Sequence, residues 1–213
     1  DNWSVTAQIG LSIFRGDFDE QGVFKFPGEI GLGINKQVLS TGIFNGGIKG
    51  QFNFGRLQGS KDGYSFENKY KEGTLNFQAI LNTWVNRNFR FEKIRPYAFA
   101  GIGFINYRVL LRDSNGYVVS GYGYKVTDGD TEGNGTNPEK DKPVTDLMIP
   151  VGVGLNYKLN KSINIELEAS SRFINSDRLD GRVRYENDKY WFISVGVTYM
   201  FNNKEFLADI FNM

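Results

Sequence analysis

The sequence predicts an all-β fold, an eight-stranded antiparallel up-and-down transmembrane β-barrel with long outer loops and short periplasmic turns. Three observations lead to this prediction: strands with one apolar face, aromatic residues that flank the apolar bands, and connections that alternate in length. In the last predicted strand, 191–201, every odd position is apolar and small or polar residues lie between them. Successive side chains of a strand point to opposite faces, so one face is continuously apolar. Its length matches the roughly 9–11 residues that a tilted strand needs to cross a bilayer.

Seven earlier segments show the same two-residue period. Their predicted ranges are 3–13, 29–35, 44–54, 75–82, 96–104, 149–157 and 163–173. The segment 96–104 is apolar on both faces, and the pattern of its glycine pair places outward Ala98, Ala100, Ile102 and Phe104. Long polar connections are predicted at 14–28, 55–71, 108–146 and 175–189, with short connections between the other strands. No helix of normal length is predicted between the strands.

Composition restricts the possible functions. Basic and acidic residues are nearly balanced, 25 against 24, which argues against nucleic acid as a partner. The basic segment 86–95 interleaves aromatic residues with cations, and we interpret it as a turn near lipid headgroups. The sequence contains no Cys and no His, so it lacks thiol chemistry and the commonest general base. We therefore predict that the protein is not an enzyme.

The same alternation also fits a soluble, lipocalin-like ligand-binding barrel whose polar face lies outside. The mean hydropathy of −0.39 is typical of a soluble protein. A membrane-spanning strand, however, needs an apolar residue at every second position only. Strand length, aromatic flanks and alternating connections favour the membrane barrel. The predicted membrane-interface aromatic residues are Trp3, Trp84, Trp191, Tyr199 and Phe201.

Charged side chains on the polar faces of the strands are predicted to lie in the lumen. These residues are Glu29, Lys49, Glu166, Glu168 and Arg172. An eight-stranded barrel has an interior just wide enough for side chains to fill it. Unpaired buried charges are costly, so we interpret these residues as a mutually paired polar plug. The alternative is a small gated pore whose ion pairs exchange partners.

An acidic segment in the third long connection has the ligand spacing of an EF-hand calcium loop. The candidate ligands are Asp128, Asp130, Glu132 and Glu139, with Gly133 at the sixth position. No helices are predicted on either side, and Gly135 occupies a position where such loops usually have a β-branched residue. The favoured interpretation is a solvated acidic loop, with bound calcium as the alternative. No other cofactor is predicted.

Three short segments carry a family resemblance. They are 55–59 (Gly-Arg-Leu-Gln-Gly) after a strand, 95–97 (Arg-Pro-Tyr) at the start of one, and 177–181 (Asp-Arg-Leu-Asp-Gly) before the last. Over residues 3–201 the chain resembles the OmpA/OmpX-type eight-stranded outer-membrane barrels, and these segments resemble the Bacteroidota branch. The resemblance implies a bacterial outer-membrane location with both termini in the periplasm. It implies no single function, because members include anchors, adhesins, small pores and subunits of larger machines.

We divide the chain into a barrel, 1–201, and a periplasmic tail or start of a linker, 202–213. Apolar residues of the tail have helical spacing, which predicts a short amphipathic helix there. The predicted function is structural or associative, as a membrane anchor or an accessory subunit of a larger outer-membrane complex. Predicted partners are outer-membrane lipid and other outer-membrane or periplasmic proteins, bound through the outer loops, the barrel wall or the tail 202–213.

Overall fold

The computed structural model describes residues 3–15, 28–40, 44–81, 93–126, 138–181 and 188–201, and the regular structure in these ranges is β-strand. The strands are β1 (Trp3–Arg15), β2 (Glu29–Ser40), β3 (Phe44–Lys61), β4 (Tyr64–Leu81), β5 (Ile94–Arg112), β6 (Val118–Tyr122), β7 (Tyr124–Lys125), β8 (Glu139–Lys140), β9 (Val144–Lys158), β10 (Ile163–Ile174) and β11 (Lys189–Met200). Among the described residues, no helix is long and apolar enough to span a membrane.

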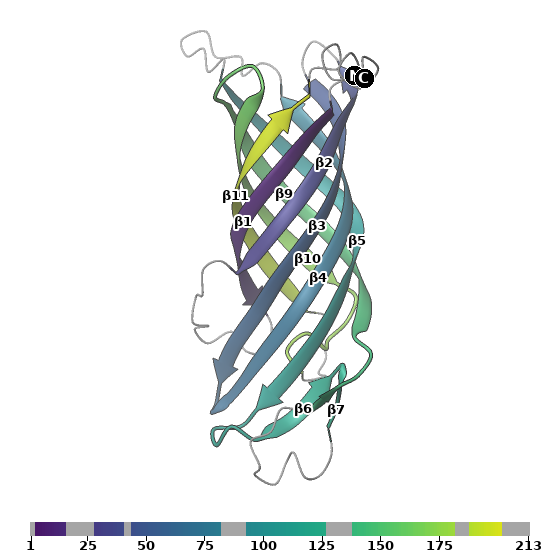
Figure 1. Cartoon of the computed structure of the whole chain (residues 1–213), viewed down its shortest axis with the longest axis vertical. Coiled ribbons are helices and arrows are strands. Elements are labelled where there is room, and N and C mark those ends of the chain that lie inside the picture. The colour runs from purple at the N-terminus through teal and green to yellow at the C-terminus, as the bar shows by residue number, and fades with distance from the viewer. Residues whose placement is uncertain are drawn as a thin grey trace, which may run out of the picture.

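Eight of the strands close into a ring, in the order β1, β2, β3, β4, β5, β9, β10, β11. Neighbours are antiparallel, and β11 pairs back onto β1 from Ser4↔Met200 to Arg15↔Lys189. Figure 1 shows these strands winding obliquely around one tall barrel. Closure is a physical requirement in a membrane, because the bilayer interior offers no water to unpaired N–H and C=O groups. The predicted eight-stranded antiparallel barrel is confirmed.

The barrel has a terminal end and a loop end. At the terminal end β1 begins where β11 finishes, and the Phe201 N–H donates to the Trp3 carbonyl at 2.9 Å. The tight turn 159–162 between β9 and β10 lies at the same end. At the opposite, loop end, β3 turns into β4 and β5 turns into β6 (Figure 1).

The middle of the barrel is apolar outside and polar inside. On β3, for example, the outward Phe52 and Phe54 are exposed, whereas the inward Gln51 and Asn53 are buried. We call the outward set the apolar belt, and its large exposed members are Val5, Ile9, Ile30, Leu32, Ile34, Ile48, Phe52, Phe54, Leu75, Phe77, Ile102, Phe104, Leu147, Ile149, Val151, Val153, Leu155, Leu167, Phe173, Ile193, Val195 and Val197. A continuous apolar surface of this extent is unfavourable in water, so the belt faces lipid hydrocarbon.

Three neighbouring strands continue beyond the belt at the loop end. β3, β4 and β5 have 18, 18 and 19 residues, more than the roughly 9–11 that a spanning strand needs. In Figure 1 they run on past the ends of β1 and β2, and β6 lies at their far end. After Phe54 the next outward residue of β3 is the exposed Arg56, and the next inward side chain is the fully buried Leu57. Both faces of the sheet therefore exchange polarity where the belt ends.

We call residues 55–70 and 105–122, beyond the belt, the extension. The apolar core at the loop end consists of Phe14, Leu57, Phe66, Tyr70, Ile105, Tyr107, Val109, Leu111, Met148, Ile174, Leu179, Tyr190 and Phe192. Burial raises the pKa of Tyr107, and its hydroxyl stays protonated and donates to Asp146 at 2.7 Å. A polar exterior over an apolar core is the pattern of a protein in water, so the extension stands outside the hydrocarbon.

The prediction of a long polar connection at 55–71 is wrong. β3 and β4 pair continuously from Phe44↔Leu81 to Lys61↔Tyr64, and Asp62 and Gly63 alone form the turn. Both turn residues have positive φ, 52° and 77°, which a two-residue type I′ hairpin requires and an Asp-Gly pair favours. This part of the strand was mistaken for a loop because its outward residues are polar. The two-residue alternation continues beyond the membrane boundary, but the polar residues are now outside and the apolar residues inside.

The predicted connection 108–146 also contains strand, because β5 runs to Arg112 and β6, β7 and β8 follow it. The predicted outward face of 96–104 is confirmed: Ala98 and Ala100 are exposed, as are Ile102 and Phe104 at 61% each. The tail 202–213 and the helix predicted in it lie outside the described residues.

We expect a charge on the belt to cost far more than a charge on the extension. Val153→Arg, near the middle of the belt, should lower the free energy of unfolding by about 2–4 kcal/mol, as for an Arg at the bilayer midplane. Gln58→Arg, on the outer face of the extension, should change it by about 0.5 kcal/mol or less. Reversible urea unfolding in lipid vesicles, followed by Trp fluorescence, measures both. Equal effects would contradict a membrane boundary at Phe54.

Candidate functional site

A group of charged side chains crosses the inside of the barrel at the level of the belt. Lys49 Nζ on β3 lies 2.5 Å from Glu166 Oε1 and 3.1 Å from Glu168 Oε2 on β10. β3 and β10 are four steps apart around the ring in either direction, so these ion pairs join opposite walls. Strand alternation directs the two glutamates inward, because Leu167 between them faces the lipid.

Hydroxyl groups also donate hydrogen bonds to the two glutamates. Tyr97 Oη donates to Glu166 at 2.9 Å and to Glu168 at 3.2 Å. Thr198 Oγ1 donates to Glu166 at 3.3 Å and lies 2.8 Å from Thr6 Oγ1. Because a buried carboxylate is costly without partners, these contacts are what make the charged interior tolerable.

Arg172 and Glu72 form a second cluster, nearer the loop end. Arg172 Nη2 lies 3.3 Å from Glu72 Oε1 and 4.0 Å from Glu168 Oε1, which links this cluster to the first. Glu72 also accepts hydrogen bonds from Asn53 Nδ2 at 2.6 Å and from the Tyr190 hydroxyl. Removal of Arg172 would therefore take away the cation with which the buried Glu72 pairs in the described part of the chain.

Glu29 lies at the loop end of the belt and has separate partners. Its Oε2 accepts hydrogen bonds from Ser12 Oγ at 2.8 Å and from the Tyr70 hydroxyl. The rings of Tyr70 and Tyr190 are 5.5 Å apart, so this tyrosine pair connects Glu29 to the cluster around Glu72.

The structure places all five predicted lumen residues inside the barrel. Four of them, Lys49, Glu166, Glu168 and Arg172, form one connected network, while Glu29 joins it only through tyrosines. Their role as a plug stays a prediction.

The sequence prediction missed Glu72 and the tyrosines that donate to the carboxylates. Glu72 continues the alternation of Thr74, Asn76 and Gln78 backwards along the chain, and that period could have identified it. Tyr97 gave no such signal, because its strand is apolar on both faces.

The charged groups of the lumen are closed off from solvent. The described ionisable groups of the network are two basic side chains, Lys49 and Arg172, and four carboxyl groups that include Glu29 and Glu72. The cations are 1% and 0% exposed, and the carboxylates are at most 4% exposed. Side chains therefore fill the lumen at this level, as expected for a ring of eight strands.

The calcium ligands predicted in the third connection fall mostly outside the described residues, which exclude Asp128, Asp130 and Glu132. Glu139 is described, and its Oε2 lies 3.1 Å from the Lys125 Nζ across the β7–β8 pair. Within the described ranges, no group of three or more acidic side chains could hold a metal ion. Calcium binding stays a prediction.

The interface aromatics point outward where they are described. Trp3 and Tyr199 lie at the terminal end with 41% and 50% exposure, and Trp191 lies towards the loop end with 45%. Phe201 is half-buried, and Trp84 is outside the described residues. The Lys36 ammonium lies 4.9 Å from the centre of the Trp3 ring, an arrangement suited to the lipid–water boundary.

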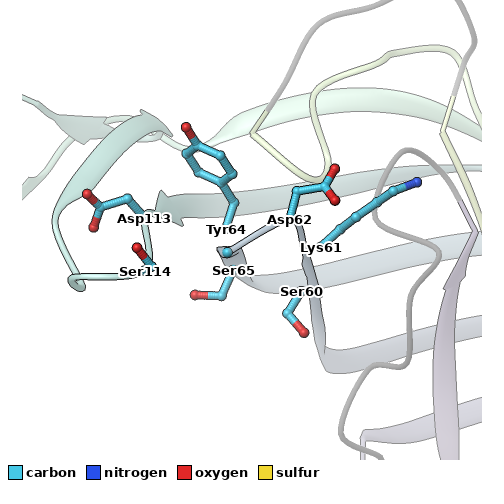
Figure 2. Close-up of a pocket in the computed structure, with 8 residues that line it drawn as sticks. Ser60, Lys61, Asp62, Tyr64, Ser65, Asp113 and Ser114 are labelled. Carbon is cyan, nitrogen blue, oxygen red and sulfur yellow. The ribbon is translucent and has the colours of Figure 1, made fainter.

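An open pocket of about 820 Å³ lies at the tip of the extension (Figure 2). It is lined by Ser60, Lys61, Asp62, Gly63, Tyr64, Ser65, Asp113 and Ser114. The first six belong to the β3–β4 hairpin, and the last two follow the end of β5. The pocket is polar and faces solvent, so it resembles a contact surface more than an enclosed ligand site.

We expect the stability of the barrel to depend on the pairing of Lys49 with Glu166 and Glu168. Lys49→Met should lower the free energy of unfolding by about 3–5 kcal/mol, because it leaves uncompensated carboxylates in the lumen. The triple variant Lys49→Met/Glu166→Gln/Glu168→Gln should recover most of that loss. Urea unfolding in vesicles measures the effect, with Lys161→Met in the exposed 159–162 turn as the control. A triple variant as unstable as Lys49→Met would contradict this account.

No protein-family model matches the chain, and no curated protein matches it significantly in sequence. Solved structures do match. Neisserial surface protein A is 10% identical with a TM-score of 0.53, and the match covers 93% of this chain and 97% of that one. Ail, the attachment invasion locus protein of Yersinia pestis, is 12% identical with a TM-score of 0.48 over 94% and 98%. The outer-membrane enzyme PagL is 13% identical with a TM-score of 0.42 over 92% and 97%.

At these identities the likeness concerns the fold, and a fold does not decide a function. The absence of enzymatic activity and the Bacteroidota branch therefore stay predictions. The chain has the fold of the eight-stranded outer-membrane β-barrels.

Proposed function

We propose that this chain is a structural or associative protein of the bacterial outer membrane, in which a sealed barrel anchors the extension and the extension binds a partner. The observation that carries the proposal is that β3, β4 and β5 continue beyond the belt and contribute to an apolar core there. A barrel that only occupied the membrane would need strands of about 9–11 residues. Binding residues are commonly placed on segments that a rigid scaffold holds in solvent.

The lumen supports anchoring over transport. Opening a path through it would separate Lys49 from Glu166 and Glu168, which hold opposite walls together. Breaking a buried ion pair leaves uncompensated charges and is costly. The two clusters are also linked through Arg172, so the rearrangement would involve more than one pair. A permanently open pore is therefore disfavoured.

The orientation of the barrel supports a partner at the cell surface. The extension lies at the end opposite Trp3 and Phe201. The barrels that the chain resembles have both termini in the periplasm, and the same orientation here would direct the extension outward. The partner would then be another outer-membrane protein or a molecule outside the cell.

The residue inventory supports a role without catalysis. The full sequence has no His and no Cys, so the commonest general base and the thiolate nucleophile are both missing. The polar pocket at the tip of the extension is open to solvent (Figure 2), whereas catalysis usually benefits from a site that excludes water.

We expect the purified barrel to conduct no ions in planar bilayers. The physical reason is the plug, whose charged groups are inaccessible to water. Single-channel recording measures this, with a porin inserted under the same conditions as the positive control. Regular conductance steps above the lipid baseline would favour the pore alternative. They would contradict the proposal that the barrel is a closed anchor.

We expect partner contacts to map to the extension. A photo-crosslinking amino acid at Ser60 or Ser65, both exposed at the tip, should give a discrete adduct in native cells. The same group at Lys161, an exposed residue at the terminal end, should not give that adduct. Mass spectrometry after mild detergent extraction identifies the crosslinked molecule. The association proposal fails if both tip positions give no adduct, or if Lys161 gives the same one.

A further inference from the structure

Three cations form a row across three neighbouring strands of the extension. Arg56 on β3 is the register partner of Lys69 on β4, and Lys69 is the register partner of Arg108 on β5. All three side chains are on the outer face, because they alternate with buried residues such as Leu57 and Tyr107. Directly opposite side chains have Cβ atoms about 4.5–5.5 Å apart. The cationic row, Arg56, Lys69 and Arg108, is therefore a compact cluster.

The cationic row lies just beyond the loop-end margin of the belt. Phe54, two residues before Arg56, is a belt residue, and its register partner is Lys71. The Lys71 ammonium lies 5.6 Å from the centre of the Phe54 ring. Two residues of strand span about 7 Å, and the headgroup layer is about 5–7 Å thick on each side of the hydrocarbon. Arg56, the member of the row nearest the belt, is thus at the depth of the lipid headgroups, and Lys69 and Arg108 continue the row away from the hydrocarbon.

Like charges placed directly opposite each other across strands are destabilising without a counter-charge. Within the described part of the chain, one carboxylate pairs with the row: Glu67 lies 3.4 Å from both Arg56 Nε and Lys69 Nζ. Arg108 Nε instead donates to the carbonyl of Asp141 at 3.1 Å. With Lys71 included, four cations face one carboxylate on the outer face of these strands. The cluster therefore has a positive excess that an external anion can neutralise.

We propose that the cationic row binds the phosphate groups of anionic lipid headgroups in the leaflet that surrounds the loop end. Arg pairs with phosphate through two parallel N–H donors, and Lys adds a compact positive charge. Clusters of Lys and Arg beside a membrane surface bind anionic lipids by the same attraction. The half-exposed stems of Arg56 and Lys69 allow their charged groups to reach down to that depth.

The proposal rests on the membrane orientation of the proposed function, and it adds a ligand class to the barrel wall. Lipid phosphate is the occupant that the position favours, because Phe54 and Phe104 on the membrane side of the row are exposed members of the belt, which faces hydrocarbon. A soluble polyanion would gain nothing from a position so close to the hydrocarbon. Free phosphate has no acyl chain, so it would gain nothing from a site beside the apolar belt.

Titration of the purified protein in neutral detergent with a diphosphorylated glycolipid tests the proposal, with bound lipid counted by native mass spectrometry. The wild type should bind this glycolipid at least about tenfold more tightly than the same glycolipid without its phosphates. The triple variant Arg56→Gln/Lys69→Gln/Arg108→Gln should lose most of that preference. The control variant Lys93→Gln/Lys158→Gln/Lys161→Gln removes the same charge at the terminal end and should retain it.

Glu67→Gln provides a test that misfolding cannot mimic. It removes the carboxylate that neutralises part of the row, so binding of the phosphorylated glycolipid should become tighter by a few-fold. Heat-dependent gel mobility shows that each variant is a folded barrel. If the folded wild type shows no preference for the phosphorylated glycolipid, the lipid site is rejected and the proposed anchor function is left intact.

Three outcomes would overturn the proposal. The first is equal binding of the phosphorylated glycolipid by the wild type and the Arg56/Lys69/Arg108 variant. The second is competition by inorganic phosphate at the concentrations at which the glycolipid binds, which would indicate a site for free phosphate. The third is binding of a soluble sulfated polysaccharide through the row without binding of the glycolipid.

Discussion

The exclusion of water from the bilayer interior is the constraint on which this structure depends. It requires every backbone N–H and C=O group at membrane depth to be paired, and β11 meets it by pairing with β1 along nearly its whole length. It also directs apolar side chains outward, which leaves the inside to polar ones. The lumen is therefore a core made of charges and hydroxyls. Such a core is stable only when its members satisfy one another, as Lys49 does with Glu166 and Glu168.

The same constraint explains why the faces of the sheet exchange roles beyond Phe54. Once β3, β4 and β5 leave the hydrocarbon, outward apolar residues would face water, so Arg56 and Lys69 take those positions. Inward positions no longer need to be polar, and Leu57 and Phe66 fill the interior. One continuous hairpin thus contains two opposite patterns. The reversal marks the membrane boundary more sharply than the aromatic residues do.

The periodicity of the sequence was sufficient to predict the barrel, because alternation is a local property. The extension was hidden for a physical reason: the period continues through 55–71 while its polarity inverts, and the Asp62–Gly63 turn was the available local signal. Inward charges such as Lys49, Glu166 and Glu168 could be found from the sequence, but which of them pair with one another could not. The pairing of Lys49 with β10 depends on ring order and register, which are properties of the closed sheet. The cationic row depends on the register of β3, β4 and β5 in the same way.

Tyr70 and Tyr190 connect the two interiors. Their rings belong to the apolar core at the loop end, while their hydroxyls donate to Glu29 and Glu72 in the lumen network. A tyrosine suits this boundary because it combines a large apolar ring with one polar group at its tip. The charged network of the lumen and the core of the extension are therefore packed as one continuous interior. This continuity fixes the position of the extension relative to the belt, as the proposed contacts with lipid headgroups and with a partner require.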